Sequence, residues 1–224
     1  HLTYEMCTEN FPDKTNFIPH SLPPEIFYPL PDDSIKTWRS QVIGEDRSDH
    51  FVVFWVNRNA KRKRGNDLLM SWKLFVDELE TKHGHRNATL LMHTNPADNE
   101  GPNLFETADM LDIKDEIVFS TDRIEFPQMN ILHNIADAHV NIAYAEGFGL
   151  ATLEAMQTGT PIIALKTGGL TRQVVDHRDE TDRIYHSFNN TQKIQETYNN
   201  KIFNLMFNGV VLQSRQEEAN KICM

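Results

Sequence analysis

Residues 138–165 read AHVNIAYAEGFGLATLEAMQTGTPIIAL, and this stretch decides the fold. The apolar run at 138–144 predicts a buried strand, and two glycines then lead into a segment rich in helix-forming residues. A second apolar run, at 161–165, predicts another strand. A strand, a helix and a strand in this order are typical of a parallel sheet whose helices cross over its faces.

Two acidic residues flank the glycine turn. Glu146 precedes the expected helix, and Glu154 lies eight positions later, more than one turn inside it. Glycines let the backbone approach a ligand closely, and the unpaired amides of a helix start suit an anion. The two carboxylates could accept hydrogen bonds from hydroxyls at opposite ends of one ligand. The pattern indicates a nucleotide sugar, although a plain strand–turn–helix with two solvated glutamates fits the same residues.

The alternation continues over the middle of the chain, which predicts an α/β fold: a Rossmann-like, doubly wound parallel sheet. The expected strands are 51–56, 88–93 and 116–120, and the expected helices are 66–82, 104–111, 128–136 and 149–158. Ligands of such sheets bind beyond the carboxyl ends of the strands, where the Glu146 turn lies.

The two ends of the chain are less patterned. Residues 1–40 contain six prolines and are expected to be an irregular connector with little core of its own. From Arg172 onward the chain is polar, with helices expected near 192–207 and after Gly209.

A basic loop follows the strand expected at 51–56. Its cations are Arg58, Lys61, Arg62, Lys63 and Arg64, five in seven positions, and they could clamp a phosphate. A solvated basic loop or a nucleic-acid patch would look the same. The formal net charge of −10 over 224 residues argues against a general nucleic-acid binder, so no nucleic-acid partner is expected.

The block EGFGLATLEAMQTGTPIIALKTGG, residues 146–169, resembles the Glu-x7-Glu signature of the retaining glycosyltransferases of group one (family four), which have the two-domain GT-B architecture. The resemblance implies that Glu146 sits by the donor sugar and that Glu154 holds the ribose hydroxyls. It implies that the backbone of Phe148, Gly149 and Leu150 faces the diphosphate and the sugar. Thr152 is counted among the donor-binding residues with them.

The same resemblance assigns roles outside this block. The family carries an Arg after its first strand and a Lys five residues later, both facing the leaving diphosphate, and Arg58 and Lys63 have that spacing. The glycines that usually flank this pair are replaced by Asn57 and Arg64. The nucleobase would lie at the loop after the strand at 116–120, which places Arg123 there.

The implied reaction is transfer of a hexosyl-type sugar with retention of configuration. No Asp-x-Asp metal motif is present, and the histidines, including His133 and His139, have no metal-ligand spacing and are expected to be structural or on the surface. No metal or cofactor is therefore expected, and the substrate is a nucleotide-sugar donor such as a UDP- or GDP-sugar. Fixed donors would stabilise the departing diphosphate.

The resemblance covers only the carboxyl-terminal, donor-binding half of the family. Residues 1–40 would then be the join to a missing amino-terminal acceptor domain, and 41–224 the donor-binding domain, so the chain alone is expected to be incomplete for catalysis. The missing half would bind an acceptor of unknown identity and could make a peripheral membrane contact. No signal peptide is visible, and Cys7 and Cys223 are interpreted as free thiols, so a cytoplasmic location is expected.

Two other classes of protein fit the same residues. One is a GT-B-type epimerase or phosphorylase, although Lys166, the candidate for a pyridoxal phosphate lysine, has a context that does not resemble one. The other is a non-catalytic domain that binds a nucleotide without turnover.

Overall fold

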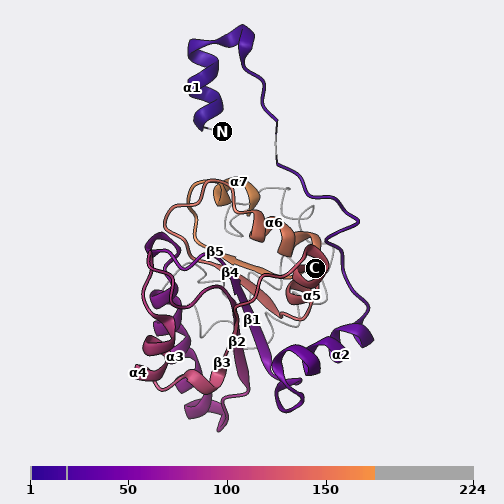
Figure 1. Cartoon of the computed structure of the whole chain (residues 1–224), viewed down its shortest axis with the longest axis vertical. Coiled ribbons are helices and arrows are strands. Elements are labelled where there is room, and N and C mark those ends of the chain that lie inside the picture. Colours follow the sequence, from indigo (N-terminus) through magenta and orange to yellow (C-terminus); the bar gives the residue numbers. More distant parts are fainter. Residues whose placement is uncertain (1, 19, 175–224) are drawn as a thin grey trace.

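A parallel five-stranded sheet of order β3-β2-β1-β4-β5 forms the centre of the computed structural model, which describes residues 2–18 and 20–174 (Figure 1). The helices expected at 192–207 and after Gly209 lie outside the described residues. The strands are β1 (Phe51–Val56), β2 (Ala88–His93), β3 (Ile117–Ser120), β4 (Ala138–Asn141) and β5 (Ile162–Ala164). The helices are α1 (Leu2–Asn10), α2 (Asp32–Ile43), α3 (Gly65–His83), α4 (Leu104–Met110), α5 (Phe126–Asn134), α6 (Leu150–Gln157) and α7 (Leu170–Gln173).

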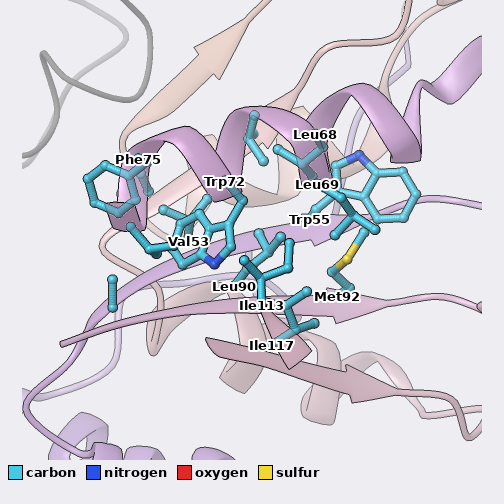
Figure 2. Packing of buried hydrophobic residues seen from close by; sticks show 14 of the residues in the cluster. Val53, Trp55, Leu68, Leu69, Trp72, Phe75, Leu90, Met92, Ile113 and Ile117 are labelled. Carbon is cyan, nitrogen blue, oxygen red and sulfur yellow. The ribbon is translucent and has the colours of Figure 1, made fainter. Parts of the chain in front are cut away.

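The sheet is buried on both faces, which explains why β1 is apolar at every position. Successive side chains of a strand point to opposite faces, and Val53 and Trp55 accordingly pack under α3, against Leu68 and Trp72 (Figure 2). The opposite face belongs to a second cluster, formed by Val52, Phe54, Ile43, Leu91, Leu132, Ile135 and Ala136. The expected α/β architecture with a doubly wound parallel sheet is confirmed.

The expectation of an irregular segment over residues 1–40 is wrong in part, because two helices begin there. Helix α2 packs on α5, and Ile43 at its end is buried in the second core cluster. The backbone amides of Tyr28 and Leu30 donate to the side chains of Asn130 and Asn134 on α5, at 3.1 and 2.8 Å. Helix α1, by contrast, stands away from the body of the domain at the far end of an extended segment (Figure 1).

The ends of the strands determine where the loops of the expected site begin. Strands β1 and β2 have the expected bounds, whereas β4 ends at Asn141 and not at residue 144. The Asn141 side chain accepts a hydrogen bond from the amide of Ala143 at 3.3 Å and donates to Thr152 at 3.2 Å, so it turns the chain out of the sheet toward α6.

The strand order reverses direction at β1. From β1 the chain proceeds outward to β2 and β3, and it then returns to place β4 on the other side of β1, followed by β5. The loops after β1 and β4 therefore leave neighbouring strands in opposite directions, which makes the crevice where open α/β sheets bind ligands. No helix in the described part of the chain is long and apolar enough to span a bilayer.

Candidate functional site

Lys63 and Glu146 meet at the point where the strand order reverses. Lys63 closes a 3-10 turn in the loop after β1, and Glu146 lies in the loop after β4. The Lys63 ammonium forms a salt bridge with the Glu146 carboxylate, and the two side chains are only 9% and 10% exposed. The structure therefore brings together two residues that the sequence assigned to one site from positions 83 apart.

Arg62 fastens the same two loops by their backbones. Its guanidinium donates to the carbonyl of Ala145 at 3.0 Å, and its own carbonyl accepts from the amide of Tyr144 at 3.1 Å. This pair of reciprocal bonds holds the loop after β4 against the basic loop. The sequence analysis gave Arg62 no role beside Arg58 and Lys63. A side chain that binds backbone atoms cannot be recognised from the spacing of residues.

The turn between Glu146 and α6 exposes backbone donors. Gly149 has a φ of +91°, a conformation that favours glycine, and α6 starts directly after it. The amides of Phe148, Gly149 and Leu150 form no hydrogen bond with any of the described residues. These amides and the positive end of the α6 dipole offer an anion site beside the Lys63–Glu146 pair.

Two glycines after β5 support the turn from behind. The amide of Gly169 donates to the carbonyl of Glu146 at 2.8 Å. A Cβ on Gly168 would collide with that carbonyl oxygen, and a Cβ on Gly169 would collide with the backbone of Gly147 and Phe148. Only glycine fits this backbone-to-backbone approach, which fixes the position of Glu146.

Thr152 and Glu154 occupy different sides of α6. The Thr152 side chain is fully buried and accepts the hydrogen bond from Asn141, so it anchors α6 to the end of β4. The Glu154 carboxylate is 14% exposed and lies 3.1 Å from Nε2 of His133, a fully buried side chain of α5. Burial lowers the pKa of His133, and the hydrogen bond with Glu154 opposes that shift. His133 is thus buried and structural, as expected, but it also touches a candidate ligand-binding carboxylate.

Arg58 is paired with carboxylates of another loop and not with Glu146. Its guanidinium is 60% exposed and binds Asp98 at 2.9 Å and Glu100 at 3.1 Å, both in the loop after β2. The hydrogen bond and charge of Asp98 raise the pKa of Arg58, and Arg58 in turn lowers the pKa of Asp98. In this state the guanidinium is shared with two carboxylates, so a phosphate would have to compete with them or use the remaining N–H groups.

The remaining predicted residues lie around the same edge of the sheet. Arg123 is exposed in the loop after β3. The Phe148 ring packs against the ring of His20 with centroids 4.5 Å apart, and its carbonyl accepts from the side chain of Gln173. Within residues 2–18 and 20–174, no group of three or more His, Cys, Asp or Glu side chains could hold a metal ion.

The glycosyl transferases group 1 family model matches residues 38–202 of the chain. This chain belongs to the glycosyl transferases group 1. Among curated relatives, the D-inositol 3-phosphate glycosyltransferase of Arthrobacter sp. (strain FB24) is 38% identical over 64 residues, which cover 29% of this chain and 15% of that protein. The enzyme of the same name from Stackebrandtia nassauensis is 28% identical over 182 residues, which cover 76% of this chain and 39% of that protein.

Solved structures of this glycosyltransferase class share the fold. A sucrose-phosphate synthase from Thermosynechococcus elongatus matches with a TM-score of 0.60 and 20% identity, over 97% of this chain and 51% of the other. Anabaena HepE, solved with UDP and glucose, matches with a TM-score of 0.61 and 16% identity, over 93% and 52%. The carboxyl-terminal domain of a group 1 glycosyl transferase from Francisella tularensis matches over 90% and 97%, at a TM-score of 0.53 and 17% identity.

The chain is shorter than most of the proteins named above. It spans about half the length of the sucrose-phosphate synthase and HepE structures and less than half of the curated relatives.

Proposed function

We propose that this chain is the carboxyl-terminal, donor-binding half of a retaining hexosyl-type glycosyltransferase, and that it takes its sugar from a nucleoside diphosphate donor without a metal ion. The observation that carries this proposal is the Lys63–Glu146 pair at the reversal of strand order, beside the amides of Phe148, Gly149 and Leu150, which have no hydrogen bond within the described part of the chain. A fixed ammonium and aligned amides suit a diphosphate, and the neighbouring carboxylate suits sugar hydroxyls.

The proposed chemistry is electrostatic. As the acceptor hydroxyl oxygen bonds to the anomeric carbon, the bond from that carbon to the donor phosphate oxygen breaks, the hydroxyl proton passes to the leaving phosphate or to solvent, and negative charge grows on the leaving diphosphate. The Lys63 ammonium and the first amides of α6 supply positive charge there, which lowers the barrier. The Arg58 guanidinium would add to it through the N–H groups that Asp98 and Glu100 leave unused, or after the diphosphate displaces one of these carboxylates. Binding of the diphosphate would draw Lys63 from Glu146 and leave that carboxylate free to accept from the sugar.

A nucleotide sugar is proposed as the donor because the site also offers groups for the ribose and the nucleobase. Glu154, partly exposed on α6, is proposed to accept the ribose hydroxyls, and the loop that contains Arg123 is proposed to face the nucleobase. HepE was solved with UDP and glucose, and the relatives named above are glycosyltransferases, which supports a UDP- or GDP-sugar as donor. The acceptor would be bound by a further, amino-terminal domain, joined through residues 1–40. That domain is also where a peripheral membrane contact is proposed.

We also propose that the protein acts in the cytoplasm. Cys7 is an exposed free thiol, which suits a reducing compartment.

Calorimetry on two matched glutamate variants tests whether Glu154 contacts the ribose and Glu146 contacts the donor sugar. Glu154→Gln should weaken the binding of free UDP or GDP and of the sugar donor alike, because an amide accepts hydroxyl hydrogen bonds less strongly than a carboxylate. Glu146→Gln should spare the free nucleotide and weaken the sugar donor. Each titration is run in EDTA and in magnesium. Loss of binding in EDTA would refute metal independence, and no effect of either variant would refute the proposed function.

A further inference from the structure

Glu154, the carboxylate proposed to bind the ribose, is hydrogen-bonded to the buried side chain of His133. Glu154 lies in the second turn of α6, and one of its oxygens, Oε2, is 3.1 Å from Nε2 of His133 on α5. The His133 side chain is fully buried, whereas the Glu154 side chain retains 14% exposure. The carboxylate therefore has a protein side, occupied by the imidazole, and a solvent side that a ligand can reach.

The hydrogen bond fixes the tautomer of the imidazole. Burial lowers the pKa of His133, so the ring is neutral near pH 7 and carries a single N–H. An ionised carboxylate only accepts hydrogen bonds, so that proton is on Nε2 and points at Glu154. Nδ1 is buried and has no partner among the described residues, so no other group competes for the proton.

The ring has little freedom to turn away. The Thr160 hydroxyl donates to the backbone carbonyl of His133 at 2.7 Å, and the ring packs edge-on against Phe54 and Phe27, with centroids 5.1 and 6.1 Å away. The ring of His139 lies 5.5 Å away, centroid to centroid, and burial lowers the pKa of His139 well below its usual value. His93 is a further titratable neighbour, and burial lowers its pKa as well. Two neutral rings thus lie behind one carboxylate, and the His133 N–H gives that carboxylate a fixed direction.

We infer that His133 is a positioning residue that sets the preference of the site for ribose over a sugar ring that lacks both the 2′- and the 3′-hydroxyl. Its Nε2–H occupies Oε2 of Glu154 and stops the carboxylate from rotating. The remaining acceptor positions, chiefly on Oε1, then face solvent in one orientation and can accept from the two neighbouring hydroxyls of a ribose. This inference rests on the proposed function, because it takes Glu154 as the ribose ligand.

Calorimetry with UDP and 2′,3′-dideoxy-UDP tests the inference, with the ratio of the two affinities as the readout. The unmodified chain should favour UDP at least tenfold, as expected for hydrogen bonds to a charged acceptor. His133→Leu should reduce the ratio to about threefold or less while the affinity for the dideoxy probe stays within about twofold, because phosphate contacts are untouched. His133→Gln, whose amide can donate from a similar position, should restore most of the ratio.

His139→Leu is the matched control, because His139 is equally buried but its ring nitrogens have no hydrogen-bond partner among the described residues. It should keep the ratio of the unmodified chain. A purely structural role of His133 would weaken both probes equally and leave the ratio unchanged.

The outcomes distinguish a wrong role for Glu154 from a wrong role for His133. No preference for UDP in the unmodified chain refutes the proposed role of Glu154, and this inference with it. A preference that Glu154→Gln abolishes but His133→Leu retains refutes the inference alone. If His133→Leu does not fold, His133→Gln and the nitrogen NMR shifts of the His133 ring decide, and a proton found on Nδ1 overturns the assignment.

Discussion

Removal of either partner of the Lys63–Glu146 pair should destabilise the domain strongly. The two side chains are 9% and 10% exposed, so Lys63→Met leaves a buried carboxylate and Glu146→Gln leaves a buried ammonium without its counter-ion. An uncompensated charge of this kind costs about 3–5 kcal/mol, and we expect the lower end, about 3 kcal/mol for each variant, since the pair lies in loops that water can enter. The double variant should lose only about 1 kcal/mol or less, far short of the sum of about 6, because it leaves no uncompensated buried charge.

Urea unfolding followed by tryptophan fluorescence measures these losses, since Trp55 and Trp72 are fully buried in the core. Lys61→Met is the matched control, because Lys61 is exposed in the same loop, and it should change the free energy of unfolding by less than about 0.5 kcal/mol. Strictly additive losses would show that the two groups do not interact, and a Lys63 variant as stable as the Lys61 variant would show that the pair is not buried in solution.

Three further outcomes follow from single contacts. Gly168→Ala should lower the thermal midpoint and weaken nucleotide binding, because its Cβ would collide with the carbonyl of Glu146; scanning fluorimetry and calorimetry check this, and an unchanged protein would refute the close approach. Burial lowers the pKa of His139 below that of the unfolded chain, near 6.5, so stability is present above that pH and is lost as the pH falls, by at most about 1.4 kcal/mol per unit. His139→Leu should flatten this slope in urea titrations between pH 7 and pH 5, and an unaltered slope would assign it to other groups. Arg58→Ala should weaken nucleotide binding roughly tenfold and Lys61→Ala little, and calorimetry that found equal losses would indicate a diffuse basic patch.

The fold could be predicted from the sequence because its signals are local. The apolar run FVVFWV has the length of a strand and no polar position, which a sheet covered on both faces requires, and β1 has the predicted bounds. The helical period of Leu69, Trp72 and Phe75 likewise matches the face of α3 that packs on the sheet (Figure 2). Helix α2 was not predicted because the prolines just before it suggested an irregular segment. Its stability comes from packing on α5, which is distant in sequence.

The candidate site was predicted in its composition but not in its pairings. The strand–turn–helix pattern singled out Glu146, the resemblance to the group one glycosyltransferases implied Lys63, and the fold brings both to the reversal of strand order. Spacing could not show that Arg58 binds Asp98 and Glu100, because those carboxylates follow a different strand. Nor could it show that His133 supports Glu154, since the two side chains belong to different helices and meet only after both have packed on the sheet.

The central position of β1 has a consequence for synthesis of the chain. Its first partner, β2, begins at Ala88, but its other edge stays unpaired until β4 is made at Ala138. During that interval a growing polypeptide carries FVVFWV with one open edge, and an uncharged, proline-free run of aromatic and β-branched residues is the kind of segment that nucleates aggregation. The strand at the centre of the finished sheet is therefore, during synthesis, a segment open to edge-to-edge pairing with other chains until β4 has been made.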